Sequence, residues 1–262
     1  MKQQAPIGIF DSGIGGTSIW KEINQLMPME HTVYLGDSAN APYGKKSKED
    51  IIALSVKNTE YLLAQGAKII VVACNTATTN AIDYLRKHYQ IPFIGIEPAI
   101  KPAALQTKTK RVGILATKGT LSSALFAKTA KEFTQDIQVT EVIGTGLVEL
   151  LEAGKPANGE LFELLAKYMA PMITAQIDYL VLGCSHYPYL IPYLKEILPP
   201  GVTIIDSGAA VAKQTKQVLK DHNALANNQN PKLRFYTNGD PEPLCYYLKD
   251  YGNAISVQQC VF

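Results

Sequence analysis

The sequence predicts an α/β fold made of two similar domains, each built on a mainly parallel sheet. The domains are expected to face a shared cleft and to be related by a pseudo-twofold axis. Short apolar runs alternate along the chain with amphipathic helical stretches, as in parallel sheets joined by helices. The runs IIVVA (69–73) and YLVLG (179–183) are apolar on both faces, which is typical of strands covered by helices on each side. A weak internal repeat relates the two halves.

The expected elements follow one another in regular alternation. Strands are predicted at residues 7–10, 32–35, 69–73, 93–96, 112–116, 138–142, 179–183 and 203–206. Helical spacing and length fit residues 48–65, 159–175 and 209–219. A polar stretch at 223–231 leads into the tail LRFYTNGD, which we expect to return to the first domain.

The repeat places one cysteine in each half. IGIFDS (7–12) resembles VGILATKG (112–119), and KIIVVACNT (68–76) resembles DYLVLGCSH (178–186). These pairs predict a first domain of residues 1–97 plus 208–262 and a second of residues 98–207. Because open α/β sheets bind ligands outside the carboxyl ends of their strands, Cys74 and Cys184 both lie where chemistry is expected. Two facing domains would put one thiol on each side of the cleft.

Composition excludes several classes of protein. The net charge is +2 and the basic residues are scattered, so no nucleic-acid stripe is present. No apolar stretch approaches the roughly 18 residues that cross a bilayer, and the N-terminus lacks the pattern of a signal peptide. Four cysteines, at 74, 184, 245 and 260, are too few and too widely spaced for a disulfide scaffold. We expect a reduced, cytoplasmic protein.

Two thiols that flank a substrate suit the inversion of an amino acid at Cα. Inversion removes a proton from one face of the carbon and delivers another to the opposite face. A free thiol has a pKa of about 8.5, which neighbouring groups can shift. One cysteine would act as thiolate and the other as thiol, with the roles set by the chirality of the substrate. A lone cysteine after a strand is more often a small buried hydrophobe, but the matched pair favours the functional interpretation.

Each thiol has polar neighbours that could assist it. His186 follows Cys184 by two residues, and it could accept the thiol proton or, as a cation, hold a thiolate. Asp11 ends the first strand and could assist Cys74, or it could cap the following helix. Glu152, in LVELLEAG, is a weaker candidate that also fits an ordinary helix carboxylate.

The remaining motifs predict a shell that binds carboxylates. Residues 12–17 form a glycine-rich loop whose backbone N–H groups could hold an anion at the start of a helix. Other candidates are the side chains that follow the predicted strands or occupy a rigid Pro-Tyr-Gly loop, namely Ser12, Tyr43, Gly44, Asn75, Thr76, Thr117, Thr120 and Ser185. Each alone also fits ordinary capping or turn chemistry.

The chain resembles the glutamate racemases of the aspartate/glutamate racemase superfamily. FDSGIGG, APYG, VVACNTATT, GILATKGT and LVLGCSHYP occur in the family's order and spacing. The resemblance implies interconversion of L- and D-glutamate, which supplies D-glutamate for peptidoglycan, without pyridoxal phosphate, metal or nucleotide. It implies Cys74 and Cys184 as the catalytic bases, assisted by Asp11, Glu152 and His186. It also implies substrate contacts from Asp11, Ser12, Tyr43, Gly44, Asn75, Thr76, Thr117, Thr120, Ser185 and His186. Family members are usually homodimers, and small molecules regulate some of them.

Three positions depart from the family pattern. Ser185 replaces the usual Thr after the second cysteine and keeps the hydroxyl. Thr17 occupies a position where an aliphatic residue is common, and Tyr189 one where Leu is common. None of the three changes the expected chemistry.

Other functions remain open at this stage. A racemase for aspartate or another amino acid would differ only in how Thr76, Thr117 and Ser185 hold the side-chain carboxylate. A two-lobed amino-acid-binding module would not need a thiol on both walls of its cleft. A metal site on Cys184 and His186 has poor spacing and no further ligands nearby in the sequence.

Overall fold

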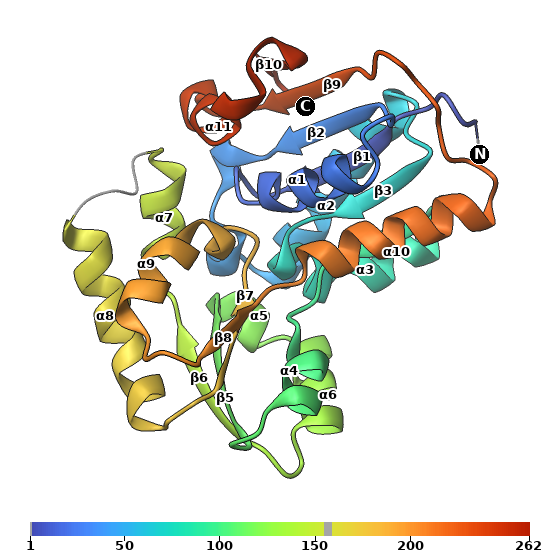
Figure 1. Cartoon of the computed structure of the whole chain (residues 1–262). Coiled ribbons are helices and arrows are strands. Elements are labelled where there is room, and N and C mark those ends of the chain that lie inside the picture. The colour runs from blue at the N-terminus through green and yellow to red at the C-terminus, as the bar shows by residue number, and fades with distance from the viewer. Residues whose placement is uncertain (1, 155–158) are drawn as a thin grey trace.

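The computed structural model describes residues 2–154 and 159–262, which fold around two parallel sheets (Figure 1). The larger sheet has six strands in the order β10-β9-β2-β1-β3-β4, and the smaller has four in the order β6-β5-β7-β8. The strands are β1 (Ile7–Asp11), β2 (Thr32–Gly36), β3 (Ile69–Val72), β4 (Phe93–Gly95), β5 (Arg111–Ala116), β6 (Gln138–Ile143), β7 (Tyr179–Gly183), β8 (Thr203–Ile205), β9 (Leu233–Thr237) and β10 (Ile255–Gln259). The predicted α/β class with two parallel sheets is confirmed.

Helices cover both sheets and connect their strands (Figure 1). The α-helices are α1 (Thr17–Leu26), α2 (Lys48–Ala64), α3 (Asn75–His88), α4 (Ile100–Gln106), α5 (Lys118–Leu121), α6 (Ala124–Phe133), α7 (Leu147–Glu152), α8 (Gly159–Thr174), α9 (Ile191–Ile197), α10 (Gly208–Asp221) and α11 (Pro241–Leu248). Short 3-10 helices are η1 (Ser38–Asn40), η2 (Tyr43–Lys45), η3 (Tyr187–Leu190) and η4 (Lys249–Ala254). None of the helices in the described ranges has the length and apolar character to cross a membrane.

The internal repeat corresponds to a shared strand order. Part of the larger sheet runs β2-β1-β3-β4, and the smaller sheet runs β6-β5-β7-β8. The repeat partners IGIFDS and VGILATKG contain the equivalent central strands β1 and β5, while the two cysteines follow the equivalent strands β3 and β7. Both cysteines therefore lie at the carboxyl edge of a sheet.

The chain passes between the two sheets twice. It leaves the larger sheet after β4 and returns after β8, so the domain boundaries expected near residues 97 and 207 fall in these two connections. On its return the chain forms α10, which packs against α1 (Figure 1). The boundaries themselves stay a prediction.

The tail adds two strands, β9 and β10, beyond those predicted from the sequence. β9 pairs with β2 from Leu233 opposite Thr32 onwards, and β10 pairs with the outer side of β9. β9 alternates buried and partly exposed residues, whereas β10 is largely exposed as an edge strand. Short strands with one exposed face give a weak apolar signal, so the sequence pattern does not predict these two strands.

Packing around Trp20 fixes the tail against the first domain. The Trp20 ring meets Phe235 and Tyr251 edge-on, each with ring centroids 4.7 Å apart, and its indole N–H donates to Thr32 Oγ1 at 3.0 Å. Aromatic pairs in this geometry stabilise the fold by more than the buried area alone accounts for.

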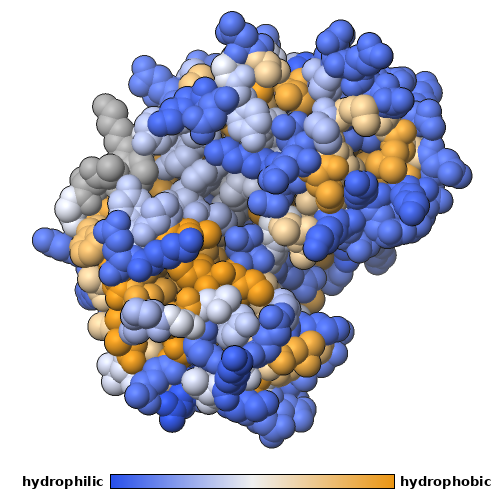
Figure 2. Space-filling model, in the orientation of Figure 1, coloured by the Kyte–Doolittle hydropathy of each residue, from blue (hydrophilic) through white to orange (hydrophobic). Residues whose placement is uncertain are grey.

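Figure 2 shows that hydrophobic side chains gather on the half of this face that holds the smaller sheet, while the other half is mostly hydrophilic.

A buried ion pair joins the N-terminal segment to the chain that follows α10. Lys68 Nζ donates to Glu30 Oε2 at 2.6 Å, to the Gln3 carbonyl at 2.7 Å and to the Ala224 carbonyl at 2.8 Å. Both charged side chains are almost fully buried, at 0% and 2% exposed. Glu30 also accepts the N–H of Ala226 at 2.8 Å, so three separate segments depend on this pair.

Candidate active site

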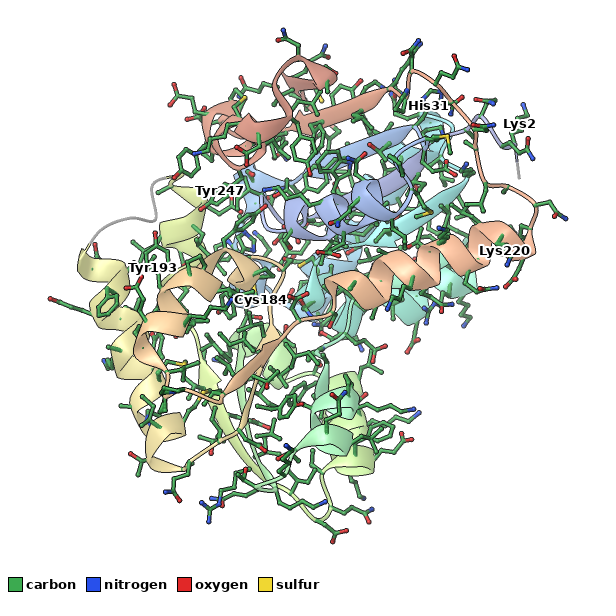
Figure 3. The ribbon with its side chains drawn as sticks, viewed as in Figure 1. Lys2, His31, Cys184, Tyr193, Lys220 and Tyr247 are labelled. Carbon is green, nitrogen blue, oxygen red and sulfur yellow. The ribbon has the colours of Figure 1, made fainter. Side chains whose placement is uncertain are left out.

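Both cysteines line one buried cavity. Cys74 caps the N-terminus of α3, and Cys184 follows β7 directly, between the two halves of the molecule (Figure 3). The cavity has a volume of about 10 Å³ and is lined by Ser12, Pro42, Tyr43, Gly44, Cys74, Asn75, Thr76, Thr117, Val148, Cys184, Ser185 and His186. That volume is about what one water molecule requires, so the cavity is closed in this conformation.

Cys74 is a neutral thiol in the closed cavity. Its Sγ donates to Ser12 Oγ at 3.6 Å and accepts the N–H of Ala77 at 3.4 Å. Burial raises the pKa of the thiol, and the nearby Asp11 carboxylate raises it further. The hydrogen bond from Ala77 acts in the opposite direction but does not reverse the shift.

Cys184 contacts a charged relay. Its Sγ lies 3.7 Å from His186 Nδ1, and His186 Nε2 lies 2.5 Å from Glu152 Oε1. Burial by itself would lower the pKa of His186, but its contacts with Cys184 and Glu152 together raise that pKa well above the ordinary value. The His186 ring therefore bridges the thiol and the carboxylate.

Asp11 links the two halves of the site. This carboxylate ends β1, is fully buried, and accepts the N–H of Gly13 at 3.0 Å and the hydroxyl of Ser185 at 2.9 Å. Burial raises the pKa of Asp11, partly opposed by the positive charge of His186. The alternative role as a helix cap is wrong, because α1 begins at Thr17 with Gly16 as its N-cap.

Glu152 is not an ordinary helix carboxylate. It ends α7, and its Oε1 accepts the N–H of Ile14 at 2.7 Å in addition to the bond with His186. The backbone of the glycine-rich loop thus holds carboxylates of the protein itself, with Gly13 bound to Asp11 and Ile14 bound to Glu152.

Close approach explains two glycines of that loop. A Cβ at Gly13 would lie 1.8 Å from Glu152 Oε1, and a Cβ at Gly15 would lie 2.2 Å from His186 Nδ1. Only glycine leaves room for these two side chains. Gly13 and Gly15 of the SGIGG pattern are therefore required by the Cys184 side of the site.

Three threonine hydroxyls from both halves meet beside the cavity. Thr76 Oγ1 lies 2.9 Å from Thr117 Oγ1 and 3.3 Å from Thr120 Oγ1, and the last two atoms are 3.0 Å apart. Thr117 also caps α5 by accepting the N–H of Thr120. The cluster offers hydroxyl donors at the boundary between the two sheets.

Tyr43 lines the cavity, but its hydroxyl has partners of its own. It donates to the Asp37 carboxylate and accepts from Asn58 Nδ2 at 3.1 Å. Sequence reasoning missed Asp37, although this residue directly follows β2, as a side chain at the carboxyl edge does. Gly44 packs against Thr117, with a Cβ position only 3.2 Å from Thr117 Cβ.

Asn75 presents an unpartnered amide to the cavity. Both Oδ1 and Nδ2 are buried and have no hydrogen-bond partner within the part of the chain that the structure describes. An unsatisfied buried amide destabilises the protein by about 1–3 kcal/mol, so such groups usually meet a ligand. Of the candidate side chains, Asn75 gives the clearest sign of substrate contact.

A wider cavity opens next to the closed one. It measures about 450 Å³, shares Gly44, Thr117 and Val148 with the inner cavity, and is bordered by Lys45, Lys46 and Lys118. Across it, Lys45 Nζ lies 2.6 Å from Glu149 Oε1. No cluster of three or more potential metal ligands occurs among residues 2–154 and 159–262.

Fold and sequence together define the class. Residues 7–215 match the family model described as Asp/Glu/Hydantoin racemase. The chain belongs to this family.

Named relatives point to one branch of the family. A glutamate racemase from Ectopseudomonas mendocina is 48% identical over 240 residues, which cover 91% of each chain. The solved glutamate racemase of Escherichia coli, in complex with L-glutamate and the activator UDP-MurNAc-ala, has a TM-score of 0.87 and 32% identity, with 98% of both chains covered. That of Francisella tularensis, in complex with D-glutamate, has a TM-score of 0.84 and 28% identity over 99% of this chain and 98% of that one.

Proposed function

We propose that the protein interconverts L- and D-glutamate by moving a proton at Cα between Cys74 and Cys184. Its activity is that of a glutamate racemase, an isomerase. One observation carries the two-base mechanism: two thiols supplied by different sheets line the same buried cavity. Structures of relatives with L-glutamate and with D-glutamate support glutamate over aspartate as the substrate.

The proposed reaction has two proton transfers. The thiolate of one cysteine takes the α-proton, the electron pair of the broken C–H bond remains on the substrate, and the opposite thiol gives its proton to the other face. The enzyme ends with the protonation states of the two thiols exchanged. Asp11 assists Cys74, and His186 with Glu152 assists Cys184, since these groups lie beside the respective sulfur atoms.

Substrate recognition is assigned to the polar lining. The free amide of Asn75 and the hydroxyls of Ser12, Thr76, Thr117 and Thr120 supply donors for two carboxylates, while the hydroxyl of Ser185 donates to Asp11. Tyr43 and Gly44 shape the wall of the cavity. The proposal extends to D-glutamate supply for peptidoglycan, a homodimer and a cytoplasmic location, all of which depend on the family resemblance.

A chiral assay tests the reaction. The purified protein is incubated in heavy water with L- or D-glutamate, or with L- or D-aspartate, and product chirality and deuterium content are measured. We expect racemisation of glutamate with solvent deuterium at Cα. Faster racemisation of aspartate would refute glutamate as the preferred substrate. Retention of the original α-hydrogen would refute proton exchange through the two thiols.

Replacing each thiol tests the two bases. Cys74→Ala and Cys184→Ala should each abolish racemisation while thermal unfolding stays cooperative, because neither thiol can transfer both protons. Cys245→Ala is the matched control, since Cys245 is exposed and outside the cavity. Substantial turnover by either active-site variant contradicts the mechanism.

A further inference from the structure

Two of the positions that depart from the family pattern touch each other. Thr17 begins α1 beside the larger sheet, and Tyr189 lies in η3 after β7 of the smaller sheet. Their hydroxyl oxygens are 2.5 Å apart although the residues are 172 positions apart in sequence. Thr17 is fully buried. A polar contact thus joins the two halves at this point.

The direction of this hydrogen bond follows from counting protons. Thr17 has one hydroxyl proton, which it donates to the Ile14 carbonyl at 2.6 Å. The proton between Thr17 and Tyr189 therefore comes from Tyr189. Burial raises the pKa of Tyr189, which keeps the phenol protonated as a donor.

The bond leads to the relay at Cys184. Ile14 accepts the Thr17 hydroxyl with its carbonyl and donates its N–H to Glu152. Glu152 in turn is hydrogen-bonded to His186. Tyr189 also belongs to the same turn as His186, because its own N–H donates to the His186 carbonyl at 3.2 Å. The Thr17–Tyr189 bond closes a ring that contains the whole His186–Glu152 pair.

Two further contacts brace this ring. Tyr247 packs on Tyr189 with ring centroids 4.3 Å apart, and its hydroxyl donates to the carbonyl of Leu151, the neighbour of Glu152. Ser18 Oγ donates to the Ser185 carbonyl at 2.8 Å. Figure 3 shows Tyr247 on the side of the larger sheet and Cys184 between the two halves. Neither Thr17 nor Tyr189 lines the inner cavity that holds the two sulfur atoms.

We propose that Thr17 and Tyr189 are positioning residues that hold His186 and Glu152 in register with Cys184, and so set the rate of proton transfer at Cys184. The inference rests on the proposed two-base function. Neither residue is proposed to contact the substrate. Thr17 acts through the backbone of Ile14, and Tyr189 acts through the η3 turn.

Isotope effects distinguish positioning from general destabilisation. For the enantiomer whose α-hydrogen faces Cys184, slower transfer at Cys184 makes breaking of the C–H bond more rate-limiting, so the deuterium isotope effect on kcat/KM rises. For the other enantiomer Cys74 breaks the bond, and slower delivery from Cys184 makes that first step more reversible, so the isotope effect falls. Each isotope effect is a ratio measured on one preparation, so a fraction of unfolded protein does not change it.

The variants are Thr17→Val, Tyr189→Phe and Thr17→Ser, measured with α-deuterated and ordinary D- and L-glutamate. We expect kcat to fall about tenfold in Thr17→Val, which leaves the half-buried Tyr189 hydroxyl without its acceptor, and by less in Tyr189→Phe. Both should change the two isotope effects in opposite directions, whereas Thr17→Ser should restore wild-type behaviour. Tyr193→Phe is the matched control on the neighbouring helix α9.

The outcomes separate the two proposals. Unchanged isotope effects for both enantiomers in Thr17→Val and Tyr189→Phe overturn the positioning role, whatever the loss of activity. Changes of the same sign in both directions overturn it as well. Wild-type protein that fails to racemise glutamate refutes the proposed function instead.

Discussion

Gly15→Ala tests whether the placement of His186 governs catalysis. A Cβ at residue 15 would lie 2.2 Å from His186 Nδ1, and the other two atoms nearest to it also belong to the His186 ring. Ordinary van der Waals contact begins near 3.4 Å, so the imidazole must move by about 1.2 Å. Such a shift takes His186 away from Cys184 or from Glu152.

The expected loss is large for so small a change. Displacement of a catalytic group by about 1 Å reduces the rate by about 100-fold, so we expect kcat to fall by that factor. Initial rates of glutamate racemisation would be measured by a chiral assay, with thermal unfolding followed on the same sample. Gly159→Ala is the matched control, because a Cβ there meets no atom within 4 Å. If Gly15→Ala kept more than a third of the wild-type kcat, the argument that His186 must stay in register would be refuted.

Three further predictions concern binding, stability and pH. Asn75→Ala should raise KM for glutamate at least tenfold in steady-state assays, since it removes the unpartnered amide of the cavity; an unchanged KM would exclude Asn75 from substrate binding. Lys68→Met should lower the free energy of unfolding in urea by about 3–5 kcal/mol, because it leaves the Glu30 carboxylate buried without its cation, and adding Glu30→Met should recover part of that loss. Partial burial disfavours the charged form of Asp178, but hydrogen bonds from Thr107, Thr109 and Lys108 lower its pKa to about 2. A lowered folded-state pKa stabilises above the unfolded value of 3.8 and loses that effect as pH falls through about 2, so Asp178→Asn should destabilise at pH 7 and approach wild type near pH 2 in thermal unfolding.

The sequence was sufficient to predict where the two cysteines lie in the fold. Apolar runs on both faces marked β3 and β7, and the position after each strand placed Cys74 and Cys184 at the carboxyl edges of two sheets. The repeat predicted that these edges are equivalent, and the shared strand order explains why. These features depend on local pattern, which one sequence displays directly.

Contacts between distant segments could not be predicted in this way. Ile14 and Glu152 are 138 positions apart, and nothing in LVELLEAG distinguishes a carboxylate that reaches the glycine loop from one in water. The same loop was interpreted as an anion site, but its glycines serve to admit Glu152 and His186. Residue types identify the candidate side chains. Their hydrogen-bond partners, however, depend on how the two halves of the chain pack against each other.

The inner cavity must widen on its outer side to admit glutamate. A volume of about 10 Å³ cannot hold glutamate, yet the thiols must lie on opposite faces of its Cα. The adjoining 450 Å³ cavity, bordered by Lys45, Lys46 and Lys118, lies where an anionic substrate would arrive, and it is spanned by the Lys45–Glu149 pair. The two side chains are 67% and 39% exposed, and an ion pair in water contributes little, so this bond does not resist opening. Thr17 is fully buried and its bond to Tyr189 lies in the ring with His186, so the geometry at Cys184 can persist while the outer side opens.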